Sequence, residues 1–245
     1  MVLRAQYKNV LEIFEKTLDL IFPKHCVSCH APGDYLCFNC FSQIQFLKTQ
    51  YCAYCQNMSV DGSTHSQCQK RLGLDGLISA AFYHGPIQSL IKSLKYSRIK
   101  DLEGTIKQLL TRFLVDEDEL FLPRSVVIPV PLHFLKRNFR GFNQAQILGQ
   151  GVAQVLDLEF KPNILTRQRF TVSQTGLKKR ERSENIAGAF AINPQAGSIV
   201  GKNIVLVDDV WTTGATIKEC SKVLKQAGAA NVWALTLARD EKKMV

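Results

Sequence analysis

Apolar runs without polar alternation recur through most of the chain, and helical patterns separate them. The runs cover residues 77–83, 125–130, 204–207 and 232–238. Unbroken runs rich in β-branched residues are typical of strands buried on both faces of a parallel sheet. Amphipathic segments lie between or after them, at 87–95, 102–114, 143–156 and 217–226. The alternation predicts a doubly wound α/β domain over residues 77–245.

One strand border carries polar residues in an informative order. Residues 204–216 read I-V-L-V-D-D-V-W-T-T-G-A-T, which places Asp208 and Asp209 where the strand is expected to end. Ligands of open α/β sheets bind at the carboxyl ends of the strands. A helix that begins there offers free N–H groups and a positive dipole end to a phosphate. Gly214 lets the backbone approach a ligand closely, and the Thr hydroxyls add donors.

The two carboxylates extend this prediction from a phosphate to a sugar phosphate. Carboxylates accept hydrogen bonds from sugar hydroxyls and can also hold Mg²⁺. No Walker A pattern is present, so a nucleoside-triphosphate P-loop is not predicted. The alternative is an ordinary buried strand followed by an acidic turn.

The segment closely resembles the phosphoribosyl-pyrophosphate (PRPP) signature of type I phosphoribosyltransferases. The resemblance implies that the T-T-G-A-T loop holds the 5′-phosphate and that the acidic pair contacts the ribose 2′- and 3′-hydroxyls. Asp208 and Asp209 are accordingly the expected catalytic residues, with Mg²⁺ accompanying PRPP. The expected PRPP-binding residues are Asp208, Asp209, Val210, Trp211, Thr212, Thr213, Gly214, Ala215 and Thr216.

A second strand border, at residues 125–130, runs into P-V-P-L-H and then a basic segment. Pro129 and Pro131 restrict this loop and remove two donors. Arg137 and Arg140 are close enough to converge on one anion, although a solvated basic turn is the alternative. Asn143 is positioned to cap the following helix. Pyrophosphate or loop contacts are expected from Val130, Pro131, Leu132, Arg137, Arg140, Arg167 and Arg182.

Residues 161–185 are basic and short of apolar residues, which predicts a long loop. Loops of this length in a compact domain are usually functional or disordered. We interpret this segment as a lid that excludes water from the site.

Residues 23–71 are dense in cysteine and form a predicted zinc-binding module. Three C-x-x-C pairs and one H-x-x-C pair supply eight ligands, which suffices for two closed tetrahedral zinc sites. We assign Cys26, Cys29, Cys37 and Cys40 to one site, and Cys52, Cys55, His65 and Cys68 to the other. An interleaved pairing or a single occupied site is the alternative. A four-ligand site has no open position, so the zinc is expected to be structural.

Residues 1–22 predict an amphipathic helix whose charges interrupt any signal-peptide pattern. No apolar run approaches the ~20 residues of a membrane-spanning helix. We therefore expect a cytoplasmic protein, with the helix packed on its own domain or, alternatively, resting on the inner face of the membrane or on a partner. The net charge of +10 favours acidic partners such as phosphorylated metabolites or nucleic acid.

The order of the motifs along the chain is more specific than the signature alone. Cysteine pairs precede P-V-P-L-H, R-G-F-N-Q, an R-x-x-x-T-x-x-Q stretch, R-x-x-N, G-A-F and the PRPP signature. This order closely resembles the ComF family, which joins a zinc module to a phosphoribosyltransferase-like domain. One departure is His65, which stands where that family commonly has Cys. His is itself a zinc ligand.

The resemblance implies a role in natural competence, in the uptake of transforming DNA or in the use of DNA as a nutrient. The first hypothesis is a protein that keeps a PRPP site and handles single-stranded DNA, with proteins of the DNA-uptake machinery as possible partners. The second is a PRPP-dependent transferase for an unidentified base or nucleotide. No base-recognition segment is identifiable, so no acceptor is named.

Overall fold

The computed structural model describes residues 23–94, 102–114, 124–132, 141–169 and 179–241. The predicted helix at 1–22 lies outside these residues, and so do Arg137 and Arg140. Among the described residues, no helix is both long and apolar enough to cross a membrane.

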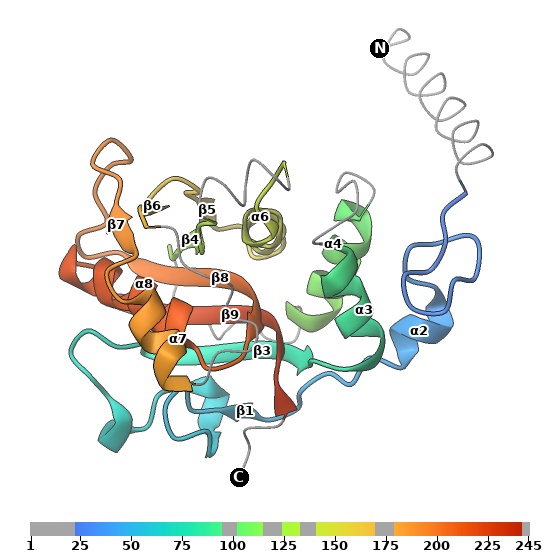
Figure 1. The fold of residues 1–245 in the computed structure, drawn as a ribbon, viewed down its shortest axis with the longest axis horizontal. Helices are drawn as coiled ribbons and strands as arrows, with labels where there is room; N and C mark the ends of the chain where they lie inside the picture. The colour runs from blue at the N-terminus through green and yellow to red at the C-terminus, as the bar shows by residue number, and fades with distance from the viewer. Residues whose placement is uncertain (1–22, 95–101, 115–123, 133–140, 170–178, 242–245) are drawn as a thin grey trace, which may run out of the picture.

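The core of the molecule is a five-stranded, fully parallel sheet, as the apolar runs predict (Figure 1). Its strands lie in the order β3 (Gly76–Phe82), β9 (Asn231–Arg239), β8 (Asn203–Trp211), β4 (Val126–Pro129) and β5 (Glu159–Phe160). The two-residue β5 pairs with the start of β4 and was not predicted. The α/β fold class is confirmed.

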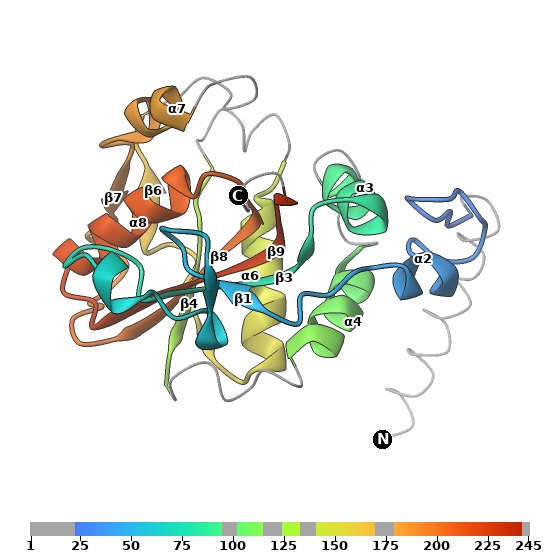
Figure 2. The ribbon, with the colours of Figure 1, turned by 90° about the horizontal axis from the view of Figure 1, so that it is seen from below.

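Helices cover both faces of the sheet, which explains why its strands lack polar alternation. One face carries α3 (Gly85–Ser93), α4 (Glu103–Leu114) and α6 (Gln144–Val155), and the other carries α8 (Ala215–Gln226) (Figures 1 and 2). Successive residues of β8 divide between two hydrophobic clusters. Val205 and Val207 join the cluster of α3, α4 and α6, whereas Ile204 and Leu206 join that of α8.

The basic segment at 161–185 is more ordered than the predicted loop. Strand β6 (Leu165–Arg167) pairs antiparallel with β7 (Phe190–Ile192), and α7 (Lys179–Ile186) lies between them in sequence. β7 therefore lies in this separate two-stranded arm and not in the main sheet. Apolar Leu165 and Phe190 are both buried, and this gives the arm its own attachment to the core. Residues 170–178 lie outside the described part of the chain.

The signature strand is longer than the sequence predicts. On the β9 side β8 stays paired through Trp211, whereas on the β4 side the ladder ends at Val207. Asp208 and Asp209 consequently lie inside β8 rather than after it. They sit where the strand extends past its shorter neighbour, so one edge of this segment faces the space beyond β4.

The cysteine-rich module runs along the outer edge of β3. Its elements are α2 (Phe38–Ser42), β1 (Gln50–Tyr51), β2 (Met58–Ser59) and the 3₁₀ turns η1 (Val60–Gly62) and η2 (Ser66–Cys68). Bridges join Phe46 to Ala81 and Ser63 to Gly76. The module therefore covers a sheet edge that would otherwise present unpaired backbone groups.

Candidate ligand site and metal centres

A pocket lies at the carboxyl ends of β4 and β8, where the strand order of the sheet reverses. From β4 the chain crosses through α6 to β5 on one side, and from β8 it crosses through α8 to β9 on the other. Such a reversal opens a crevice between the loops, and this is the usual ligand position in open α/β sheets. The cavity measures about 150 Å³. It is lined by Val130, Pro131, Leu132, Asn143, Gln144, Ala145, Arg167, Asp208, Asp209 and Thr216.

The acidic pair forms one wall of this pocket. Asp208 and Asp209 are both half-buried, and the backbone N–H of Asp209 donates to the Asp208 carboxylate at 2.9 Å. This bond orients Asp208 from within its own strand. Two carboxylates so placed supply acceptors for sugar hydroxyls and oxygen ligands of the kind that Mg²⁺ takes.

The T-T-G-A-T loop turns from β8 into α8 through Gly214. Its φ of +70° is a left-handed conformation that favours glycine. A Cβ at this position would also meet the Trp211 ring at 2.2 Å. Both constraints require glycine, and the helix begins at the next residue with Thr216 facing the pocket.

Trp211 is a predicted PRPP-binding residue that does not line the cavity. Its side chain is 1% exposed and packs beneath Gly214, so the indole supports the loop instead of reaching a ligand. Val210 packs partly against the core of the α6 face. Thr213 is buried as well, and its hydroxyl accepts a hydrogen bond from the Ala215 N–H at 3.4 Å. The loop thus has a supporting layer and a ligand-facing layer.

Of the four predicted arginines, one is seen at the pocket. Arg167, on β6, lines the cavity and stacks on the Phe190 ring at 5.4 Å. Burial lowers its pKa, while the nearby Cys220 and Asp208 act in the opposite direction. Arg182 lies in α7, and its side chain is outside the described part of the structure, as are Arg137 and Arg140 in full.

Two lining residues have stronger roles than the sequence suggested. Asn143 caps α6 through its Oδ1, which accepts from the Ala145 N–H at 3.2 Å, and its Nδ2 donates to the Val130 carbonyl at 3.0 Å. Gln144 is 3% exposed. A signal for Gln144 exists in the helical pattern, because it shares a buried face with Leu148 and Val152 at four-residue spacing.

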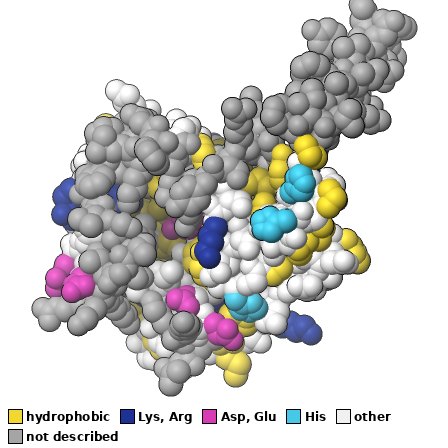
Figure 3. All heavy atoms as spheres, turned by 45° about the vertical axis from the view of Figure 1, so that its right-hand side comes forward, with side chains coloured by type: hydrophobic (Ala, Val, Ile, Leu, Met, Phe, Trp, Pro, Cys, Tyr) yellow, Lys and Arg dark blue, Asp and Glu magenta, His cyan; other side chains and the backbone are white. Residues whose placement is uncertain are grey.

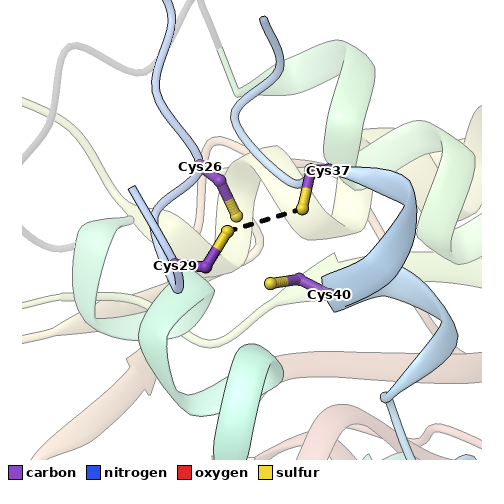
Figure 4. A group of neighbouring side chains, drawn as sticks. All are labelled: Cys26, Cys29, Cys37 and Cys40. Carbon is purple, nitrogen blue, oxygen red and sulfur yellow. Dashed lines mark hydrogen bonds between the residues drawn. The ribbon is translucent and has the colours of Figure 1, made fainter. Parts of the chain in front are cut away.

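The first cysteine group comes together at the side of the molecule that carries α2 (Figure 4). The four sulfur atoms of Cys26, Cys29, Cys37 and Cys40 lie within 4.8 Å of one another, and two of them are 3.6 Å apart. Thiolates around a tetrahedral zinc with bonds of about 2.3 Å are separated by about 3.8 Å. The spacing therefore fits a zinc ion.

The second group contains Cys52, Cys55, His65 and Cys68, with the same upper limit of 4.8 Å between donor atoms. His65 Nδ1 lies 3.2 Å from the Cys55 sulfur, and its Nε2 lies 3.0 Å from the Met58 carbonyl. A backbone partner on the second ring nitrogen fixes the tautomer that leaves Nδ1 as a metal ligand. The replacement of Cys by His is thus compatible with metal binding.

The acidity of the thiols also fits a bound dication. Burial alone would raise the pKa of Cys26, but backbone N–H groups of Cys29 and Cys37 lower it to about 6. Burial and the neighbouring thiols raise the pKa of Cys40 to about 12. Four thiolates this close together would repel one another. A metal ion supplies the positive charge that lets all four deprotonate.

Comparison with known proteins agrees with both halves of this architecture. Residues 17–69 match the double zinc ribbon domain, and residues 144–244 match the phosphoribosyl transferase domain. Competence protein F of Haemophilus influenzae is 31% identical over 227 residues, which cover 89% of this chain and 98% of that protein. The chain belongs to the ComF family.

Other ComF relatives show how far the similarity extends. The DNA utilization protein YhgH of Escherichia coli K12 is 34% identical over 65% of this chain and 70% of its own length. Competence protein ComFC of Streptococcus pneumoniae is 27% identical over 83% of this chain and 87% of its own. The sequence resemblance is therefore confirmed at the level of the family and its two domains.

Proposed function

We propose that this ComF-family protein binds PRPP in the pocket between β4 and β8 and acts in the handling of single-stranded DNA. The observation that carries the first part is the convergence of the acidic pair, the start of α8 and Arg167 on one cavity. The 5′-phosphate would lie at the T-T-G-A-T loop. Asp208 and Asp209 would accept hydrogen bonds from the ribose hydroxyls and hold Mg²⁺ with the ligand. When bound, Mg²⁺ would neutralise charge on the diphosphate.

The DNA part of the proposal draws on the relatives and on charge. The relatives' names refer to competence and to DNA utilisation, and the net charge of +10 favours a polyanionic partner. The described face around the first cysteine group offers mainly apolar side chains and histidines, with few basic ones (Figure 3). The basic sequence segments at 92–100, 136–140 and 167–182 would supply the DNA contacts.

A PRPP-dependent transferase is the second candidate function. The same pocket supports it, because ligand, carboxylates and metal would be those of a transfer reaction. Release of pyrophosphate in the presence of PRPP, Mg²⁺ and a candidate base or single-stranded DNA would identify it. Stable binding of PRPP without release would favour the DNA-handling protein.

The PRPP site is tested by thermal shift. PRPP with Mg²⁺ should raise the melting temperature, since a ligand that binds only the native state stabilises it. Asp208→Asn with Asp209→Asn should abolish that shift without unfolding the domain. Asp157→Asn with Glu159→Gln is a matched control, because it removes two exposed carboxylates beside the start of β4, at the other end of the strand from the pocket. A shift that survives the first pair of substitutions would refute the site.

DNA binding is tested by anisotropy with a labelled oligonucleotide at physiological salt. The logarithm of the affinity should fall with the logarithm of the salt concentration, at a slope of about −0.7 per phosphate neutralised. Replacing Lys178, Lys179 and Arg180 by Ala should weaken binding and flatten the slope. Absence of binding at micromolar protein would leave the transferase as the better hypothesis.

A further inference from the structure

The wall of the pocket formed by the end of β4 is poor in backbone donors. Pro129 and Pro131 have no N–H, and the Val130 N–H already donates to the Val207 carbonyl at 2.9 Å. The Val130 carbonyl in turn accepts from Asn143. The segment 129–131 is therefore rigid and has no backbone N–H left for an anion. The expectation that Val130 and Pro131 hold pyrophosphate directly cannot rest on their backbone.

The start of α6 lies against the same wall, but most of its donors are engaged too. The Ala145 N–H is capped by the Asn143 side chain, and the Gln146 N–H donates to the Asn143 carbonyl at 3.0 Å. A helix start still contributes a positive dipole end. The N–H groups of Ala145 and Gln146 are therefore not available to a ligand.

Gln144 offers a side-chain donor at this wall. Its side chain is 97% buried, it lines the pocket, and its Nε2 is buried with no hydrogen-bond partner in the described part of the chain. An amide group buried without a partner costs stability, and native proteins leave few of them. A turn of the carboxamide towards the cavity would let its N–H meet an acceptor that a ligand brings.

We propose that the Gln144 carboxamide is a ligand-binding group that donates to an oxygen of the diphosphate of PRPP. This inference rests on the proposed function and adds to it the residue that holds the second anionic end. PRPP carries a phosphate at one end and a diphosphate at the other. With the 5′-phosphate at the T-T-G-A-T loop, the diphosphate faces Gln144 and the positive end of α6. Val130 and Asn143 act as positioning residues, because their mutual hydrogen bond fixes the start of the helix.

The experiment compares Gln144→Leu with the native chain by calorimetric titration of three probes with Mg²⁺: PRPP, inorganic pyrophosphate and ribose 5-phosphate. Loss of a hydrogen bond to a charged group should weaken the binding of PRPP and of pyrophosphate roughly 10- to 100-fold. Ribose 5-phosphate has no diphosphate, so its affinity should stay unchanged. Gln146→Leu is the matched control, since Gln146 is exposed two residues further along the helix and should leave all three affinities unchanged.

A stability measurement separates ligand binding from a structural role. Without ligand, Gln144→Leu should melt at the same or a higher temperature, because it removes a buried polar group without a partner. If that variant fails to fold, Gln144→Met tests the same point with an unbranched side chain. Equal weakening of ribose 5-phosphate and pyrophosphate, or unchanged pyrophosphate affinity, would overturn the role of Gln144. Failure of the native chain to bind any probe would instead refute the PRPP site itself.

Discussion

The two cysteine groups have similar donor geometry but are attached to the α/β domain in different ways. The first packs through apolar side chains on the α3 and α4 face, with Cys26, Leu36, Cys40 and Ile44 in that hydrophobic cluster. The second is also held by polar contacts. Gln50 makes two hydrogen bonds to the Ser79 backbone, and the Tyr54 hydroxyl accepts from the Leu74 N–H at 2.9 Å.

The second group also reaches the support of the ligand loop. Lys218, in the first turn of α8, lies over the Tyr54 ring at 4.8 Å and over the Trp211 ring at 5.2 Å. Trp211 is the residue that packs beneath Gly214. Tyr54 lies between two of the predicted zinc ligands, so a chain of contacts connects the second metal centre to the T-T-G-A-T loop. Two metal centres with similar donor geometry can therefore differ in the contacts that tie them to the ligand-binding domain.

The largest expected effect contrasts one ligand from each centre. Cys52→Ser should cost several kcal/mol, roughly 10 °C in melting temperature, and should remove the PRPP-induced shift, because a structural metal supplies folding energy. Cys26→Ser should lower the zinc content but retain the PRPP shift. Elemental analysis, melting curves and limited proteolysis of residues 23–71 distinguish the two. If both variants lost the PRPP-induced shift equally, the second centre would support the ligand loop no more than the first does.

The next effect concerns Arg239, which is fully buried and donates to Gln56 Oε1 at 2.6 Å. Gln56→Leu should cost about 1–3 kcal/mol or more, because it leaves a buried charge without this acceptor. Combining it with Arg239→Met should recover much of the loss, since no charge then remains. Urea unfolding measures both. Gln43→Leu, on an exposed glutamine beside the first centre, is the control and should change stability by less than about 0.5 kcal/mol.

The same arginine predicts a dependence on alkaline pH. Burial lowers the pKa of Arg239 to about 10, and Tyr51 acts in the opposite direction. The folded state therefore binds this proton less tightly than the unfolded state does. Below pH 10 the buried charge of Arg239 lowers the free energy of unfolding by its full amount. This loss diminishes as the pH rises through 10 towards the pKa of arginine in the unfolded chain. The native chain should accordingly gain stability relative to Arg239→Met in melting curves between about pH 9 and 11. A constant difference would argue against a shifted pKa.

The smallest effect tests the contact between the second centre and the ligand loop. Lys218→Met should cost about 0.5–1 kcal/mol, as expected for a lost cation–π interaction. It should also weaken PRPP binding more than Lys222→Met does, and Lys222→Met removes an exposed charge from the same helix. Melting curves and calorimetry provide the two values. Identical behaviour of the variants would mean that Lys218 does not transmit support from Tyr54.

Local pattern was sufficient for most of the fold. The apolar runs located β3, β4, β8 and β9 because strands buried on both faces need no long-range information to be recognised. β5 was not predicted, because a strand of two residues is too short to show a periodic pattern. The pairing of β6 with β7 was not predicted, because it joins segments some 25 residues apart, across a basic stretch.

The residues of the candidate site also fall into two groups, those that a local motif contains and those whose surroundings form only on folding. The acidic pair and Gly214 were visible because a short motif contains them, and the two cysteine groups because ligand spacing is local. Gln144 and Arg239 were not recognised, because their importance depends on which groups surround them after folding. The buried position of the Trp211 ring was not predicted, because a motif does not tell which of its side chains face the cavity and which support the loop.

The hydrogen bonds between Gln50 and the Ser79 backbone have a consequence for the order of folding. Strand β3 pairs with β9, and their Ser79 and Thr236 are 157 residues apart, whereas Gln50 is only 29 residues from Ser79. Closing the shorter loop is cheaper by about 1.5 kcal/mol in chain entropy. We expect the cysteine-rich segment to occupy the outer edge of β3 before β9 arrives. Pulsed hydrogen exchange during refolding should then show early protection of the Ser79 amide, and chelation of zinc should delay it.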